Sequence, residues 1–192
     1  DIAFEKVVES HWRQTLAASP FLAASLGDKQ SANQLPNVSV AHQRKLAHES
    51  AKILSKLSEI DSARLSVVNQ VNQAILKRLL IDEALEFTHK TYLIPISNRS
   101  GFHMRFAELH KSLPFKTTQD YHNYIDRLDK FGEYTDQHIA LLTEGIATRN
   151  VLPAVVLEGY EETITAHIVQ DPTKSLLYIP FKDFPSEMTD SA

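Results

Sequence analysis

The sequence predicts an all-α protein built as an irregular multi-helix bundle. Apolar residues recur every three or four positions over most of the 192-residue chain, which is the spacing of one helix face. No useful length of sequence alternates apolar and polar residues, as a half-buried strand would. Only five glycines are present, few for a β-rich protein with many tight turns, and the 43% of hydrophobic residues is enough for a core.

The first half of the chain predicts long helices, each with an apolar stripe and a recognisable end. The first helix covers residues 2–18, and Pro20 ends it because proline lacks the backbone N–H. Ser39 is a suitable N-cap for a second helix over about 40–60, and a third runs over about 64–91. The stripes expected to face inward are Phe4, Val8, Trp12 and Leu16, then Leu46, Ile53, Leu57 and Ile60, then Val68, Val71, Ile75 and Leu79, widened by Leu76, Leu80 and Leu85.

The second half predicts shorter or interrupted elements. Residues 92–116 are irregular, with a short helix at 103–112. Thr117-x-x-Asp120 resembles a capping box and starts a fourth helix that runs to about 148. A fifth helix is expected over 153–169, and a sixth starts at Ser186-Glu187. Because the sequence stops almost at once after that, we expect residues 1–192 to be a single helical domain or lobe that is truncated at its C-terminus.

Composition excludes several classes of function. The net charge of −4 leaves no basic surplus to neutralise phosphates, so nucleic acid is not an expected partner. No apolar run approaches the ~20 residues of a membrane-spanning helix, so no transmembrane segment is expected. The absence of cysteine excludes disulfides and thiolate metal sites.

The nine histidines do not form a recognisable metal motif. His48-Glu49 begins like the zinc-peptidase pair of histidines four apart, but Lys52 occupies the second position. Glu86-x-x-His89 matches half of a di-iron helix motif whose second copy is missing. His138 and His167 lie near apolar stripes and are expected to be partly buried, hydrogen-bonded histidines. We therefore predict no metal ligand, no cofactor and no catalytic residue in this segment.

The irregular stretch is the best place to look for a binding site. Polar residues in a long, partly apolar connection can line a pocket, and they can equally cap helices or bind nearby backbone. The residues that we expect to contact a substrate here are Asn98, Gly101 and His103. The Ser100-Gly101 pair lacks the Gly-x-Ser-x-Gly context of a serine hydrolase, so no nucleophile is predicted.

An ordered series of short stretches resembles the N-terminal region of a bacterial family, domain-of-unknown-function family 885. Each stretch is weak by itself, but their order and spacing cover nearly the whole chain. The stretches are Ser19–Gly27, Leu35–Ser39, Ile60-Asp61, Tyr92–Gly101, Pro114–Thr117, Asp120–Leu128, Gln137–Ile139, Glu144–Ile146, Pro153 and Leu177–Phe181.

The resemblance implies more than the residues themselves. Members look like helical zinc metallopeptidases, often secreted or lipid-anchored in the bacterial envelope, so it implies a periplasmic or envelope location and a lipid anchor upstream of Asp1. Their metal motif, His-Glu-x-x-Pro-Gly-His, has no counterpart in these residues. Zinc is therefore expected in a missing C-terminal lobe of the same protein, where it would polarise a scissile carbonyl while a glutamate activates water.

Two functions remain open at this point. The chain is expected to be the N-terminal scaffold lobe of a larger metallopeptidase-like fold, and to form one wall of a cleft for a peptide substrate. The alternative is a self-standing, non-enzymatic helical module that binds a partner in a groove. The gene downstream of Ala192 would distinguish them, because only a peptidase requires a long continuation with the zinc motif.

Overall fold

The structure, a computed structural model, describes residues 1–188 and confirms the all-α fold, with no strand among those residues. A lone antiparallel bridge joins Ile96 to Gly101. Contacts divide the chain into two compact units: the first unit is Asp1–Pro20 with Pro36–Tyr92, and the second is Phe21–Leu35 with the residues from Leu93 onward. The helices are α1 (Ile2–Ala18), α2 (Pro20–Ser25), α3 (Val40–Ser58), α4 (Val67–Thr88), α5 (Phe102–Ala107), α6 (Thr118–Asp129), α7 (Phe131–Ala147), α8 (Ala154–Leu157) and α9 (Tyr160–Thr165).

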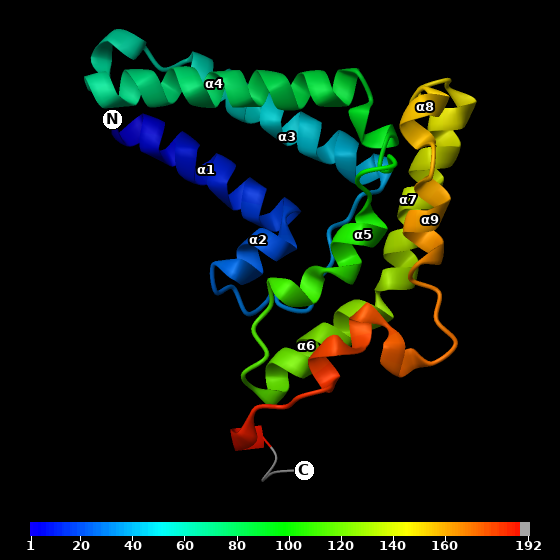
Figure 1. Cartoon of the computed structure of the whole chain (residues 1–192). Coiled ribbons are helices and arrows are strands. Elements are labelled where there is room, and N and C mark those ends of the chain that lie inside the picture. The colour runs from blue at the N-terminus through cyan, green and yellow to red at the C-terminus, as the bar shows by residue number, and fades with distance from the viewer. Residues whose placement is uncertain (189–192) are drawn as a thin grey trace. The chain divides into compact units, whose positions relative to one another are not determined.

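The first unit packs α1, α3 and α4 around a small apolar core (Figure 1). The predicted N-cap is confirmed, because the Ser39 hydroxyl accepts a hydrogen bond from the His42 N–H. Between α3 and α4, Asp61 caps a 3-10 turn (Ser62–Arg64) and Ser66 caps α4. The buried core residues are Phe4, Val7, Ile53, Leu57, Leu65, Leu76 and Leu80.

The predicted stripes of α1 and α4 are only partly buried. On α1, Phe4 is buried, but Val8 and Trp12 are 40% and 46% exposed. On α4, the predicted stripe is at the surface, whereas Leu76 and Leu80, which were predicted to widen the same apolar arc, are buried in the core. The apolar arc of α4 is wider than the face that α1 and α3 cover. Periodicity predicts the whole arc but does not predict which part of it the two helices bury.

The second unit is held by two clusters of aromatic rings. Phe106 stacks on Phe131 with ring centroids 4.0 Å apart, which joins α5 to α7. Farther along, Tyr124 of α6 is fully buried, and its hydroxyl donates to the Leu177 carbonyl at 3.1 Å. The rings of Phe115, Tyr121, Phe181 and Phe184 surround this second cluster.

A buried arginine fixes the segment that follows α2. The Arg127 side chain is completely buried, and its Nε and Nη2 donate to the carbonyls of Gln34 and Ser31, each at 3.2 Å. Its guanidinium lies 5.2 Å from the centre of the Phe21 ring, and burial lowers its pKa to about 10. One turn later, Lys130 Nζ donates to the Asn33 carbonyl at 2.9 Å. Two cations of α6 and its C-cap thus bind the main chain of residues 31–34.

Two helices predicted as continuous are broken, and one element lies largely outside the described residues. The capping box at Thr117 and Asp120 is confirmed, but the helix that it starts ends at Asp129, where the backbone of Lys130 (ψ −9°) bends before α7. Gly159, with φ +78°, separates α8 from α9 in a left-handed conformation that glycine adopts without strain. Of the expected sixth helix, the structure describes a 3-10 turn at Ser186–Met188, and the rest lies outside the described residues.

Two neighbouring leucines of α4 provide a test of this core. Leu80 is fully buried and Leu79 is 49% exposed, so they differ in environment but not in chemistry. We expect Leu80→Ala to lower the free energy of unfolding by about 3 kcal/mol, because it leaves a cavity in the core. Leu79→Ala should cost no more than about 0.5 kcal/mol, as expected for an exposed position. Urea unfolding followed by circular dichroism measures both, and equal losses would contradict the assigned faces of α4.

Candidate functional site

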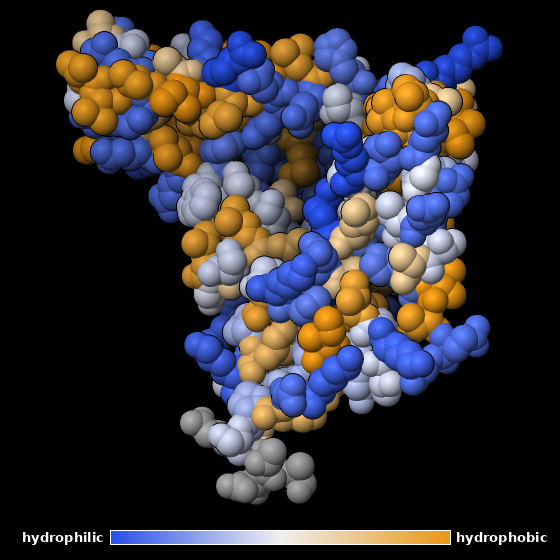
Figure 2. Space-filling view, viewed as in Figure 1, coloured by the Kyte–Doolittle hydropathy of each residue, from blue (hydrophilic) through white to orange (hydrophobic). Residues whose placement is uncertain are grey.

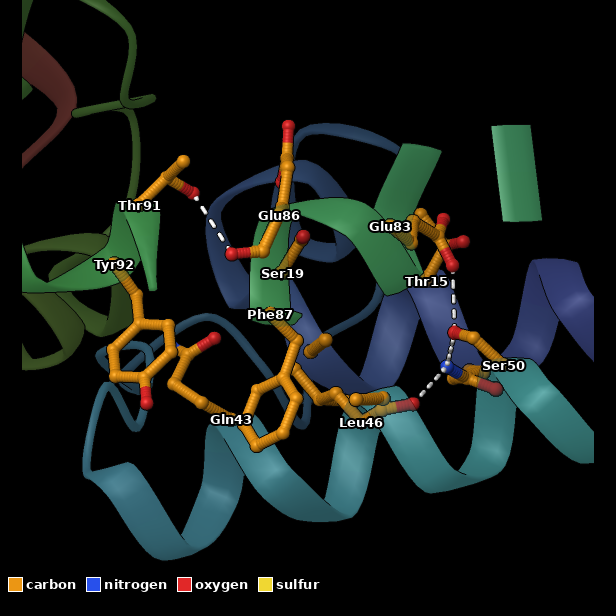
Figure 3. Close-up of a pocket in the computed structure, with 13 residues that line it drawn as sticks. Thr15, Ser19, Gln43, Leu46, Ser50, Glu83, Glu86, Phe87, Thr91 and Tyr92 are labelled. Carbon is orange, nitrogen blue, oxygen red and sulfur yellow. Dashed lines mark hydrogen bonds between the residues drawn. The ribbon is translucent and has the colours of Figure 1, made fainter. Parts of the chain in front are cut away.

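The main candidate site is a half-open pocket of about 350 Å³ inside the first unit, between α1, α3 and the C-terminal part of α4 (Figure 3). One wall is apolar and aromatic: the rings of Phe87 and Tyr92 stack with centroids 5.7 Å apart, and Leu46 lies beside them. The other lining residues are mostly polar or small. They are Gln14, Thr15, Ala18, Ser19, Gln43, Ala47, Ser50, Glu83, Glu86 and Thr91.

A network of polar side chains closes one end of this pocket. The Ser50 hydroxyl on α3 donates to Glu83 Oε2 on α4 at 2.6 Å, and it accepts from Gln14 Nε2 on α1 at 2.9 Å. His11 Nε2 lies 3.1 Å from the other carboxylate oxygen of Glu83. Ser50 is 2% exposed, whereas the Glu83 side chain is 40% exposed. Each of the three helices therefore contributes to one hydrogen-bonded chain.

The order of this network determines what it can do chemically. In the common catalytic triad, a histidine within hydrogen-bonding distance takes the proton of the serine, and a carboxylate behind the histidine orients it. Here the carboxylate lies between the other two groups. Glu83 contacts both Ser50 and His11, and the serine hydroxyl donates its hydrogen bond to Glu83 and not to a histidine. The arrangement can bind and orient a ligand at its exposed edge, but it lacks the order of a catalytic triad, and Ser50 is too buried to meet a substrate.

Only one carboxylate is directed into the pocket. The side chain of Glu86 points away from the other labelled residues in Figure 3, and its main-chain carbonyl accepts from the Thr91 hydroxyl at 3.3 Å. Glu86 thus lines the pocket with its backbone. The half of a di-iron motif that Glu86 forms with His89 belongs to no metal site here: within residues 1–188, no three histidine, aspartate or glutamate side chains are placed to hold one ion.

The predicted substrate-binding residues lie elsewhere, in the second unit: Asn98 is in the tight turn before α5, Gly101 is the N-cap of α5, and His103 is in its first turn. The Ser97 N–H donates to the Ser100 carbonyl at 2.8 Å, and the Asn98 N–H donates to the Val156 carbonyl at 3.0 Å. His103 Nε2 lies 2.9 Å from the Thr163 hydroxyl. Asn98 and His103 therefore connect this segment to α8 and α9. The sequence allowed two roles for these polar residues, lining a pocket or hydrogen bonding to nearby helices and backbone, and these contacts are of the second kind.

Gly101 leaves room for the ring of His103. A Cβ on Gly101 would lie 2.4 Å from His103 Cε1, so any side chain there has to displace the imidazole. Burial lowers the pKa of His103, and His167 and Arg105 add to that effect. Nearby, Ile94 and Ile96 help line an apolar cavity of about 240 Å³ whose lining does not include Asn98, Gly101 or His103. The three residues are brought together, but their role as a substrate contact stays a prediction.

His138 lies under this turn and differs from its expected state. It is 5% exposed, and its ring stacks on Phe102 with centroids 3.9 Å apart. It was expected to be hydrogen-bonded, yet neither ring nitrogen has a partner in the described part of the chain. Burial, with a smaller effect from Arg105, lowers the pKa of His138 to about 4.

Sequence reasoning missed the pocket of the first unit because its residues are far apart in the chain. One signal was present: Ser50 interrupts the inner face of α3 between Leu46 and Ile53, at helical spacing. A polar residue on an otherwise apolar face needs a partner when it is buried. The sequence alone does not show that this partner is Glu83.

The chain matches one model of a protein family. The model described as "Bacterial protein of unknown function (DUF885)" matches residues 20–192. The chain belongs to this family. The resemblance inferred from the short stretches is thereby confirmed at the level of DUF885 membership. No curated protein and no solved structure matches the chain.

The buried His138 predicts how this DUF885 chain responds to acid. Its pKa of about 4 in the folded state lies below the ordinary value of 6.5, so the unfolded chain binds the proton more readily. Stability should therefore fall as pH decreases below about 6.5 towards 4. His138→Phe, which keeps a ring against Phe102, should flatten this dependence.

Urea unfolding at neutral pH and at about pH 5 measures the effect. His122→Phe is a control, because His122 is an exposed histidine of α6. An unchanged pH dependence in the His138 variant would contradict the assignment.

Proposed function

We propose that this chain is a recognition and scaffold lobe of a zinc-peptidase-like protein of the bacterial envelope, and that it contributes one wall of a peptide-binding cleft but no catalytic group. The observation that carries the proposal is the pocket between α1, α3 and α4. It combines an aromatic wall, several uncharged hydrogen-bonding side chains and one carboxylate, without an activated nucleophile. Such a surface suits a peptide, which presents alternating side chains and backbone polar groups.

The ligand groups of residues 1–188 do not fit a zinc site. Catalytic zinc is held by three protein ligands drawn from His, Asp, Glu and Cys. The chain has no cysteine, and the histidines and acids of residues 1–188 do not converge on any point. In this proposal the ion and the glutamate that activates water belong to another lobe of the same protein, and no step of the reaction is placed here.

The alternative function, a non-enzymatic interaction module, is supported by a different observation. Four large apolar side chains of α1 and α4 are 40–54% exposed along one groove of the first unit. Exposed apolar grooves of this kind bind partner helices. The two functions differ in one measurable property: the complete gene product loaded with zinc should hydrolyse peptides if the chain is a peptidase lobe, and should not if it is a module.

A metal assay tests the division of roles. We expect the 192-residue chain, exposed to zinc and then dialysed, to retain only substoichiometric zinc by mass spectrometry, because its ligands are dispersed. His48→Ala and His89→Ala, at the two motif fragments in the sequence, should leave that value unchanged. Retention of one tightly bound zinc, lost in either variant, would contradict the proposal.

Filling the pocket tests its role in binding. Gln43 on α3 lines the pocket, and its neighbour Arg44 is exposed and outside the lining. We expect Gln43→Trp to weaken binding of a short alanine-rich peptide about tenfold or more, which corresponds to about 1.4 kcal/mol. Arg44→Trp should bind as the unmodified chain does. Calorimetric titration measures both, and equal affinities would rule out the pocket as the peptide site.

A further inference from the structure

A groove of about 460 Å³ runs along the first unit between α1 and α4, on the side that α3 does not cover. Phe4 and Leu76, both buried, form its floor. Its walls are Val8 and Trp12 on α1 and Ile75 and Leu79 on α4, which are 40%, 46%, 54% and 49% exposed. The groove is separate from the pocket of Figure 3, because it uses different faces of both helices.

The apolar surface continues beyond the groove. Val71 and Val68, one and two turns before Ile75 on α4, are 56% and 69% exposed. Figure 2 shows apolar side chains gathered over the α4 part of the first unit. A lone exposed valine needs no explanation, but a row of branched side chains facing a tryptophan across a groove marks an interaction surface.

The shape of the groove fits a helix. Two helices that diverge on one side of a three-helix unit leave a channel in which the ridge of a fourth helix can lie, as in four-helix bundles. The wall residues recur at i and i+4 on both α1 and α4, so a partner with apolar residues at i, i+3, i+4 and i+7 can interdigitate with them.

Charge along the groove distinguishes one edge from the other. Its only charged lining residues are Glu5 and Glu9, four apart on α1, whereas the α4 edge carries the neutral Asn69 and Asn72. Glu9 contacts the exposed Arg13 at 3.6 Å, and Glu5 forms no ion pair in the part of the chain that the structure describes. The α1 edge is therefore acidic, and a row of basic side chains on the occupant would complement it.

We propose that this groove binds an amphipathic helix of a partner protein, with the apolar face of that helix between α1 and α4 and its lysine or arginine residues along Glu5 and Glu9. The other occupants fit less well. A second copy of the chain would bring the same acidic and neutral edges and no basic row. An anionic lipid surface would meet the two carboxylates with repulsion.

Trp12 makes the proposal directly measurable. It is the only tryptophan in the chain and is 46% exposed on the groove wall, so a docked helix should shift its fluorescence emission to shorter wavelength. The probes are two synthetic helical peptides with the same leucine stripe, one with lysine and one with glutamate along the flank. We expect the lysine peptide to bind about tenfold more tightly at low salt, and the difference to shrink as salt screens the charges.

Variants separate the apolar and charged contributions. Leu79→Glu should weaken the lysine peptide about tenfold or more, whereas Leu85→Glu, at a 45% exposed position of α4 outside the groove, should not. Glu5→Gln with Glu9→Gln should remove the preference between the two peptides and leave the apolar contact in place. Circular dichroism checks that each variant retains its helices.

Four results would overturn the proposal. They are equal affinity of the two peptides for the unmodified chain, unchanged binding by the Leu79 variant, a dimer in sedimentation that Leu79→Glu dissociates, and a Trp12 shift produced by phosphatidylglycerol vesicles but by neither peptide. The groove does not overlap the peptide pocket at Gln43, so this proposal and the proposed substrate role succeed or fail independently.

Discussion

The first unit depends on one buried hydroxyl. Ser50 of α3 links Gln14 of α1 to Glu83 of α4 through hydrogen bonds of 2.9 and 2.6 Å. A carboxylate that accepts a short hydrogen bond from a buried donor is strongly oriented. Apolar packing lets helices slide and rotate at little cost, whereas this network is satisfied in only one register. The polar contacts thus determine the relative rotation of α1, α3 and α4, and with it the shape of the pocket beside them.

The same constraint limits the chemistry of the pocket. Each carboxylate oxygen of Glu83 contacts a side chain of another helix, so protonation of Glu83 during a reaction would weaken the contacts that join the helices. A binding role is compatible with this, because a bound peptide can use the neighbouring amides, hydroxyls and rings without disturbing the network. Membership in DUF885 fits a lobe of this kind, in which structure and recognition share residues while reaction chemistry is carried elsewhere.

Much of the fold could be predicted from local sequence. The long helices over 2–18 and about 40–60 and the caps at Ser39 and Thr117 follow from short-range rules, and the structure has them. Failures came where the deciding contact is distant. The bend at Lys130 accompanies an ammonium group bound to the carbonyl of Asn33, ninety-seven positions away. The inward face of α4 depends on which side of a wide apolar arc α1 and α3 cover, and periodicity carries no information about that choice.

The candidate sites also differ in whether their residues are close together or far apart in the sequence. Asn98, Gly101 and His103 could be grouped from sequence because they lie within six consecutive positions, and the structure places them in a turn and the start of the helix that follows it. The residues of the pocket network come from three helices and are separated by 33 to 72 positions, so no local pattern joins them. The sequence alone indicates only that Ser50 is a polar residue on an otherwise apolar helix face, and it does not identify the partners of Ser50.

The clamp formed by Arg127 and Lys130 has a consequence for how this chain can vary. Both cations bind main-chain carbonyls of residues 31–34, and two side-chain contacts add to them: Lys130 Nζ donates to Gln34 Oε1 at 3.3 Å, and Asn33 Nδ2 donates to Asp126 Oδ2 at 2.8 Å. The path of that loop is thus encoded in α6 and its C-cap, remote from the loop itself. Replacements at loop positions that α6 holds only through the main chain should be accepted as long as the backbone keeps its course, and evolutionary restriction should fall most strongly on the two basic residues that hold it.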